Sequence, residues 1–165
     1  MYNLLLCGFM GCGKTTVGRL LASQLSMEYI DLDAQIEQDA QIRIPDIFAQ
    51  YGEAYFRDLE HEAICALARR ISCIVSTGGG AMTFSRNVQA VDAKDRVLFL
   101  DASFESCYVR IQNSDRPLVR NNTKEQLQTI YQTRHAAYQK AASIRVCADG
   151  TPAQIAAQIR QLCNL

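Results

Sequence analysis

The feature that most constrains this chain is a glycine-rich segment near its start, Gly8-Phe9-Met10-Gly11-Cys12-Gly13-Lys14-Thr15. The segment fits the pattern G-x-x-x-x-G-K-[ST], whose backbone N–H groups form a concave site for phosphate. An apolar run over residues 4–7 precedes it, and a helical pattern over residues 17–25 follows it. The loop therefore joins a strand to a helix whose N-terminus attracts anions. A glycine-rich turn that contains a lysine by chance would not require a strand before it and a helix after it.

The residues of this loop predict a site for Mg²⁺-ATP. Lys14 is expected to reach the β- and γ-phosphates, and the hydroxyl of Thr15 to bind Mg²⁺. Cys12 is the cysteine best placed to react, because a helix N-terminus favours the thiolate. Its simpler role is to occupy a variable position of the loop. The residues of the loop assigned to ATP binding are Gly11, Cys12, Gly13, Lys14, Thr15 and Thr16.

Beyond the loop, apolar runs alternate with helical segments. Such strands are typical of a parallel sheet that is covered on both faces. The sequence therefore predicts an α/β fold with a doubly wound, five-stranded parallel sheet and helices on both faces. Ligands of such sheets bind beyond the carboxyl ends of the strands. A length of 165 residues suits a single domain over residues 1–165. The expected strands cover residues 4–7, 29–32, 71–76, 96–100 and 144–147.

The composition excludes several other classes of protein. Lysine and arginine together (17) equal aspartate and glutamate together (17), so the chain lacks the broad basic surface of a nucleic-acid-binding protein. Its seven cysteines are odd in number and form no C-x-x-C pair, which favours free thiols in a reducing cytoplasm. No apolar run approaches the roughly 18 residues of a membrane span, and the N-terminus lacks the pattern of a signal peptide.

Two carboxylates close the second expected strand as Asp31-Leu32-Asp33. Alternation along a strand would place both on one side, at the edge of the sheet where the phosphate loop lies. Asp31 is then a candidate ligand of Mg²⁺ or its waters, and Asp33 a candidate for orienting and deprotonating a hydroxyl group. The alternative is that either aspartate caps the helix that follows.

A basic residue and a glycine run mark the next candidate site. Arg57 follows a short expected helix over residues 46–50 and lies three residues before Glu60, so a helix would bring the two side chains together. Arg57 braced by Glu60 would suit a substrate carboxylate, whereas the alternative is an exposed ion pair. Thr77-Gly78-Gly79-Gly80-Ala81 follows the third strand, and its glycines allow a ligand to approach the backbone.

The least regular region is the polar segment over residues 112–123, which contains Arg116 and Pro117. A loop of this length in a compact domain is a candidate lid. Its Arg116 is expected to close over a transferring phosphoryl group. Thr123 with Gln126 has the pattern of a capping box that begins the next helix. That helix contains Arg134, which by itself is typical of a solvated surface cation.

Together these motifs resemble the shikimate kinases, a family of P-loop small-molecule kinases in the nucleoside monophosphate kinase-like group. The resemblance covers essentially the whole chain. The residues that carry it are the loop over 8–16, Asp31-Leu32-Asp33, Ile47-Phe48, Gly52-Glu53 with Phe56-Arg57 and Glu60, Gly78-Gly79-Gly80, Arg116-Pro117-Leu118, and Arg134 with Tyr138.

The resemblance implies an activity: transfer of the γ-phosphate of ATP to the 3-hydroxyl of shikimate, in aromatic amino acid biosynthesis. It also implies Mg²⁺ as cofactor and a monomeric, cytoplasmic enzyme that binds neither nucleic acid nor membrane. A substrate-binding helical region would cover residues 33–61, and the lid residues 112–123. The segment Asn113-Ser114-Asp115-Arg116 is short, however, and lacks further basic residues that some relatives have there.

The resemblance also assigns roles to single residues. Lys14, Asp33 and Arg116 would be catalytic, with Asp33 contacting the ring hydroxyls and acting as the base. Arg57 and Arg134 would clamp the carboxylate of shikimate. The backbone of Gly79 and Gly80 would lie beside that carboxylate. From their positions in the family, Arg110 and Thr151 would lie at the adenine.

Two other functions compete with this one. Another small P-loop kinase, such as a gluconate kinase, would share the loop and the lid but needs no paired arginines, and its activity on gluconate would distinguish it. A catalytically inactive domain that serves as a binding module is the second alternative. The presence of Lys14, Thr15, Asp33 and Arg116 gives that alternative no support.

Overall fold

The strands of the computed structural model, which describes residues 2–165, form one parallel sheet in the order β2-β3-β1-β4-β5. This arrangement confirms the predicted fold class. The central strand β1 is fully buried and forms the middle of the hydrophobic core. The strands are β1 (Leu4–Cys7), β2 (Glu28–Asp31), β3 (Cys73–Ser76), β4 (Arg96–Asp101) and β5 (Ile144–Cys147).

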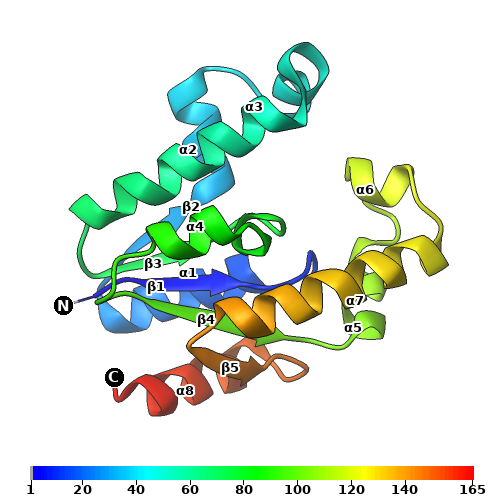
Figure 1. Ribbon diagram of the computed structural model, residues 1–165. Helices are drawn as coiled ribbons and strands as arrows, with labels where there is room; N and C mark the ends of the chain where they lie inside the picture. Colours follow the sequence, from blue (N-terminus) through cyan, green and yellow to red (C-terminus); the bar gives the residue numbers. More distant parts are fainter. Residues whose placement is uncertain (1) are drawn as a thin grey trace.

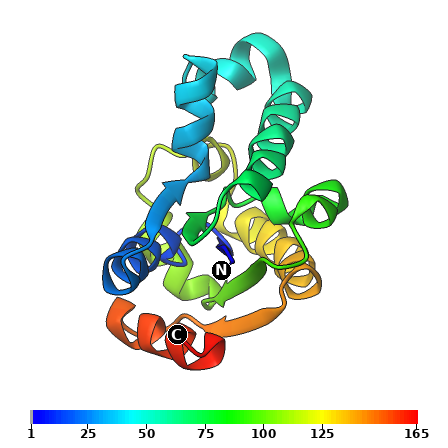
Figure 2. The same cartoon turned by 90° about the vertical axis from the view of Figure 1, so that its left-hand side faces the viewer.

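Helices cover both faces of this sheet (Figure 1). Helices α1 and α8 lie on one face, and α4 and α7 lie on the other (Figure 2). Helices α2 and α3 extend beyond the β2 edge, and α5 and α6 follow the carboxyl end of β4 (Figure 1). The α-helices are α1 (Lys14–Leu25), α2 (Leu32–Ala40), α3 (Ile44–Ala66), α4 (Ser85–Ala90), α5 (Phe104–Ile111), α6 (Pro117–Arg120), α7 (Lys124–Ala141) and α8 (Pro152–Cys163). Among residues 2–165, every helix is too short or too polar to span a bilayer.

Three expected strands have different bounds in the structure. The second begins one residue earlier, at Glu28, and the fourth ends one residue later, at Asp101. The second ends at Asp31, not at residue 32, because the side chain of Asp31 accepts a hydrogen bond from Ala34 N and so begins α2. The third begins at Cys73, not at residue 71. Ser72 has a φ of 59°, which interrupts the extended backbone, and Ile71 is 58% exposed.

The expected short helix over 46–50 is part of the longer helix α3. The backbone of α3 is non-helical at Gly52, with φ 82° and ψ 174°, so the helix bends there. A small apolar cluster of Ile36, Ile47 and Phe56 joins the first part of α3 to α2. The capping box of Thr123 and Gln126 is confirmed at the start of α7.

A buried asparagine fastens the amino ends of the strands. Asn3 is 0% exposed. Its Nδ2 donates to Arg70 O (3.1 Å) and Asp95 Oδ2 (3.0 Å), and its Oδ1 accepts from Cys73 N (3.0 Å). One side chain thus joins the segments that lead into β1, β3 and β4, at the end of the sheet opposite the phosphate loop.

We expect Asn3→Ala to lower the free energy of unfolding by roughly 2–4 kcal/mol, because it leaves several buried backbone groups without partners. Urea denaturation followed by circular dichroism measures this loss. The exposed Asn113→Ala is the matched control and should change stability by less than about 0.5 kcal/mol. Equal midpoints for the two variants would contradict this role for Asn3.

Candidate active site

The phosphate loop lies at the carboxyl end of β1, as predicted, and α1 begins directly after it at Lys14. Gly13 makes this possible, because it precedes the helix with a φ of 99°, a conformation that L side chains rarely adopt. The amino group of Lys14 donates to Gly8 O (2.7 Å) and Phe9 O (3.2 Å) and so lies over the loop. The loop is thus a preformed cradle with a cation inside it.

Helix α5 forms one wall of the loop. The guanidinium of Arg110 donates to Gly11 O at 2.7 Å, which brings a second cation to the loop, while the assignment of Arg110 to the adenine stays a prediction. Cys12 is only 1% exposed, and its sulfur lies 3.6 Å from the amino group of Lys14, so it is a packed part of the loop. Thr15 and Thr16 are exposed on the first turn of α1.

Two other residues assigned to the nucleotide lie farther along the chain. Arg116 is exposed at the start of α6, a single helical turn inside the segment expected to be irregular. Thr151 precedes α8, where its side chain accepts a hydrogen bond from Gln154 N in a capping box. The structure therefore gives Thr151 a capping role, while its assignment to the adenine stays a prediction.

The prediction that Asp31 and Asp33 share one side of a strand was wrong. Asp31 ends β2 and caps α2, so the alternative of helix capping is confirmed for this residue. Asp33 lies in the first turn of α2, and its buried Oδ1 has no hydrogen-bond partner among the described residues. Burial raises the pKa of the Asp33 carboxyl and Asp31 adds to the rise, whereas Lys14 and Arg57 oppose it. Asp33 thus lies between the loop lysine and an arginine of α3.

Arg57 and Glu60 form the predicted pair, but the pair is not exposed. Arg57 Nη1 donates to both carboxylate oxygens of Glu60, at 3.1 and 3.0 Å, and the side chain of Glu60 is 1% exposed. Burial raises the pKa of Glu60, and the Arg57 guanidinium opposes this rise. The guanidinium also packs on the rings of Phe56 and Phe84, 5.1 and 5.0 Å from their centres. Arg57 is therefore fixed from several sides.

The three glycines after β3 bring the charged groups together. A Cβ atom on Gly78 would lie 2.7 Å from Asp33 Oδ1, and one on Gly80 would lie 2.7 Å from Arg57 Nη1. On Gly79 it would lie 3.4 Å from Nη1 of Arg134. Side chains of α2, α3 and α7 thus converge on one short stretch of bare backbone, which we call the glycine loop (78–80). Arg134, which alone resembled a surface cation, is only partly exposed there.

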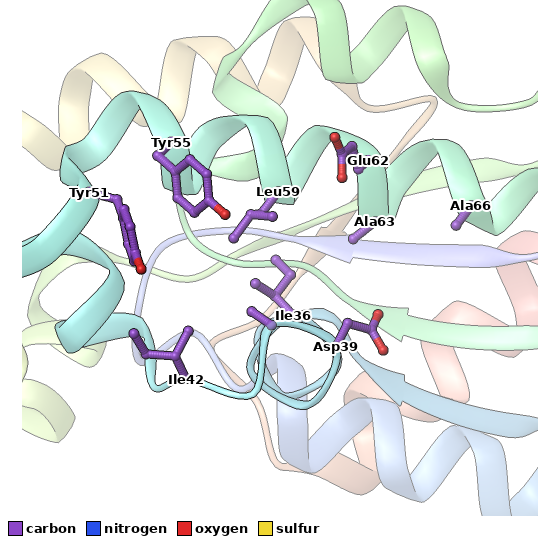
Figure 3. Close-up of a pocket in the computed structure, with 10 residues that line it drawn as sticks. Ile36, Asp39, Ile42, Tyr51, Tyr55, Leu59, Glu62, Ala63 and Ala66 are labelled. Atoms are coloured by element: carbon purple, nitrogen blue, oxygen red, sulfur yellow. The ribbon is translucent and has the colours of Figure 1, made fainter.

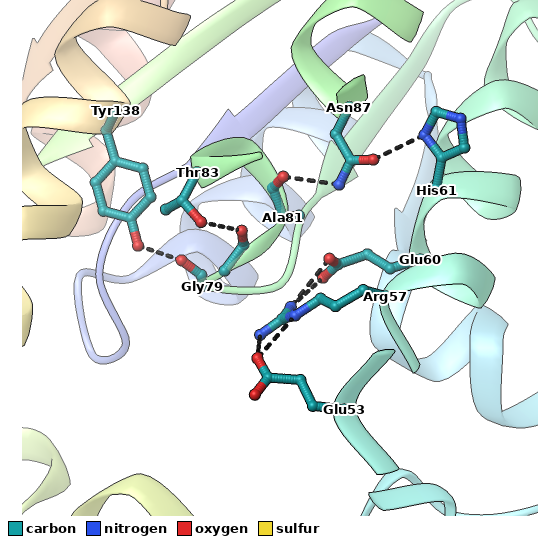
Figure 4. A network of polar contacts seen from close by, with 10 residues as sticks. Glu53, Arg57, Glu60, His61, Gly79, Ala81, Thr83, Asn87 and Tyr138 are labelled. Atoms are coloured by element: carbon teal, nitrogen blue, oxygen red, sulfur yellow. Dashed lines mark hydrogen bonds and ion pairs between the residues drawn. The ribbon is translucent and has the colours of Figure 1, made fainter. Parts of the chain in front are cut away.

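Several residues around the glycine loop were given no role from the sequence. Tyr138 is 1% exposed and its hydroxyl donates to Gly79 O, while burial raises the pKa of its phenol. Thr83 and Asn87 also bind carbonyl groups of this segment (Figure 4). Tyr138 had a signal in its spacing from Arg134. Thr83, Phe84 and Asn87 lie in no motif, so only the folded chain reveals them.

A separate cavity of about 420 Å³ lies between α2 and α3 (Figure 3). Its walls include Tyr51, Tyr55 and Glu62, on the face of α3 opposite Arg57 and Glu60. None of the residues that the sequence assigned to a site lines it. We therefore place the chemistry at the glycine loop and the phosphate loop, where the charged groups meet.

Proteins with similar sequences are described as shikimate kinases. A family model described as shikimate kinase matches residues 10–164. The shikimate kinase of Sulfurihydrogenibium sp. (strain YO3AOP1) is 40% identical over 161 residues, which cover 96% of each chain. That of Geobacter sulfurreducens (strain ATCC 51573 / DSM 12127 / PCA) is 44% identical over 141 residues, 84% of this chain and 78% of the relative.

Solved structures of similar fold include proteins of the same family. The structure titled "Shikimate kinase from Acinetobacter baumannii in complex with shikimate" has a TM-score of 0.92 at 33% identity and covers 99% of this chain and 93% of that one. A deoxyadenosine kinase from M. mycoides with bound dATP has a TM-score of 0.67 at 13% identity and so shares the fold. Because the family model and the relatives match nearly the full length of the sequence, the chain belongs to the shikimate kinase family.

Proposed function

We propose that this chain transfers the γ-phosphoryl group of ATP to the 3-hydroxyl of shikimate, giving shikimate 3-phosphate and ADP, in aromatic amino acid biosynthesis. The observation that carries the proposal is the convergence of Asp33, Arg57 and Arg134 on the glycine loop. Shikimate is a ring that bears a carboxylate and several hydroxyl groups. Its carboxylate therefore needs cations, and its hydroxyl groups need a hydrogen-bond acceptor. The solved structure of the relative from Acinetobacter baumannii is titled as a complex with shikimate.

Asp33 is the general base in this proposal. Its carboxylate would accept the proton of the 3-hydroxyl while that oxygen bonds to the γ-phosphorus. The bond from phosphorus to the bridging oxygen then breaks, and its electron pair leaves with ADP. Burial raises the pKa of Asp33, and a base becomes more effective as its pKa approaches the working pH. Among residues 2–165 the Oδ1 of Asp33 has no hydrogen-bond partner, so it would be free to accept a hydrogen bond from a hydroxyl group.

The carboxylate of shikimate would lie between Arg57 and Arg134. The buried Glu60 holds the guanidinium of Arg57 in one orientation, so little side-chain entropy is lost when the substrate binds. Such a pair of cations favours a substrate that bears a carboxylate over an uncharged sugar. This arrangement supports shikimate over gluconate, whose flexible chain gains less from a rigid clamp.

Lys14 and Arg116 would act on the phosphates. Lys14 lies on the loop carbonyls of Gly8 and Phe9 and would exchange them for phosphate oxygens. Arg116 is exposed at the start of α6, and closure of the segment 112–123 as a lid would bring it to the γ-phosphate. Closure would also expel water that could otherwise accept the phosphoryl group.

The residues near the loop fit Mg²⁺. The hydroxyl of Thr15 and the carboxylate of Asp31 are oxygen donors, which Mg²⁺ prefers, usually together with substrate phosphates. Residues 2–165 hold no group of three or more His, Cys, Asp or Glu side chains able to bind a metal by themselves. Thr15, Asp31 and the phosphates of the nucleotide would therefore hold Mg²⁺ together, and the ion would neutralise charge on those phosphates. We further propose a single domain that acts as a cytoplasmic monomer.

Lys14→Met is expected to abolish phosphoryl transfer in a folded protein, because it removes the cation of the phosphate loop. A coupled assay with ATP, Mg²⁺ and shikimate measures this, and circular dichroism checks the fold. The exposed Lys140→Met is the control and should keep normal turnover. Normal turnover by a folded Lys14→Met protein would contradict the assignment of this loop to phosphate binding.

Arg57→Ala and Arg134→Ala should each weaken shikimate binding by about 2–5 kcal/mol and leave ATP binding nearly unchanged, because each removes one half of the clamp. Isothermal titration calorimetry with each ligand measures both. Because Arg57→Ala leaves Glu60 buried and unpaired, the variant Arg57→Ala/Glu60→Gln repeats the test with less strain. The exposed Arg69→Ala is the control. Unchanged shikimate affinity in all clamp variants would contradict the clamp.

Arg116→Ala should lower kcat at least roughly tenfold, as loss of a transition-state cation does, with little change in shikimate affinity. Amide hydrogen exchange over residues 112–123 should be fast in the free protein and slow with shikimate plus a non-hydrolysable ATP analogue. Exchange over α8 is the internal control. Protection of 112–123 without ligands, or none with both bound, would show that this segment is not a lid.

A further inference from the structure

Three consecutive carbonyl groups at the glycine loop each have a side-chain donor. Tyr138 from α7 donates to Gly79 O, and Thr83 Oγ1 donates to Gly80 O at 2.6 Å. Asn87 Nδ2 from α4 donates to Ala81 O at 2.8 Å (Figure 4). The backbone beside the two arginines is thus fixed by side chains from different helices, which is more than a turn between a strand and a helix requires.

Asn87 connects this backbone to α3. It is 1% exposed, and its Oδ1 lies 2.9 Å from Nδ1 of His61. Since the amide nitrogen of Asn87 is bound to Ala81 O, its oxygen must be the acceptor, and Nδ1 of His61 therefore carries the hydrogen. The result is a directed chain from His61 through Asn87 to Ala81.

This chain starts close to Arg57. His61 follows Glu60 directly and lies one helical turn after Arg57 on α3. Phe84, whose ring packs on the Arg57 guanidinium, immediately precedes α4, the helix that contains Asn87. The carboxylate clamp therefore has one arginine on α7 and one on α3. Helix α7 is hydrogen-bonded to the glycine loop directly through Tyr138, and α3 is linked through His61 and Asn87 to Ala81, the residue that follows the loop.

We propose that Asn87 is a positioning residue for the substrate carboxylate. Through His61 it fixes α3, and with it Arg57, at a set distance from the glycine loop and Arg134. The inference rests on the proposed function, because it assumes that the clamp holds the carboxylate of shikimate. It predicts that breaking the chain loosens recognition of the carboxylate while leaving the nucleotide site as it is.

The test uses His61→Ala and Asn87→Asp. His61 is partly exposed, so its loss should leave the fold intact, while Asn87→Asp keeps the size of the side chain and removes the donor to Ala81 O. Each variant is expected to raise the KM and Kd for shikimate roughly tenfold, within the range of couplings through a packed network, and to leave the KM for ATP within about twofold. His61→Asn, which restores a donor near the position of Nδ1, should recover most of the affinity.

A second ligand separates positioning from a general structural effect. The methyl ester of shikimate lacks the charged carboxylate, so a variant that acts through the clamp should lose affinity for shikimate but not for the ester. Arg86→Ala is the matched control. It removes the exposed ion pair of Arg86 with Asp58 (2.8 Å), which also joins α4 to α3 but does not reach the loop, and should bind shikimate like the parent.

The outcomes are distinct. A parent protein that does not phosphorylate shikimate would refute the proposed function. An active parent whose His61→Ala variant binds shikimate normally would overturn the inference alone. So would equal losses of affinity for shikimate, its ester and ATP, because these would indicate general loosening of the fold.

Discussion

The close approach of charged side chains to bare backbone at the glycine loop is the constraint on which the site depends. Asp33, Arg134 and Arg57 come from three helices. A methyl group on Gly78 or Gly80 would lie 2.7 Å from Asp33 or Arg57, and one on Gly79 would lie in contact with Arg134, at 3.4 Å. Helices α2 and α3, which extend beyond the sheet, are thereby joined to α7, which packs on it. A methyl group added to Gly78 or Gly80 would push Asp33 or Arg57 outward, so the loop sets the dimensions of the site.

The charges of the site are balanced locally in a chain whose net charge is zero. Glu60 is fully buried, and a buried carboxylate is costly unless a cation with good geometry accompanies it. Arg57 supplies that cation through two hydrogen bonds. Glu60 in turn keeps Arg57 oriented, while Asp33 lies within reach of both Lys14 and Arg57. The free-energy cost of burying Glu60 is therefore offset by its pairing with Arg57 at the site itself.

The sequence predicted the features that depend on a single local pattern, and it failed where two local patterns compete or where distant segments decide. The phosphate loop, the order of strands and helices, and the pair of Arg57 and Glu60 all follow from short patterns. The end of β2 did not, because Asp31 prefers to cap a helix over continuing a strand. The burial of Glu60 and the role of Asn87 depend on helix packing that no window of sequence contains. The assignments of Arg110, Arg116 and Thr151 to the nucleotide remain predictions.

The bend of α3 at Gly52 depends on a backbone conformation that disfavours L-amino acids. Within the described part of the chain, a Cβ atom at this glycine would meet no atom within 4 Å beyond its neighbours, so space for a side chain is not what excludes other residues. The positive φ of 82° with ψ near 174° is instead the mirror image of an ordinary extended conformation. The position therefore selects against L-residues by chirality, whereas the glycine loop selects by size. A D-alanine built in by chemical synthesis would fit the bend of α3 without strain, and it would make rigid the joint between its two segments.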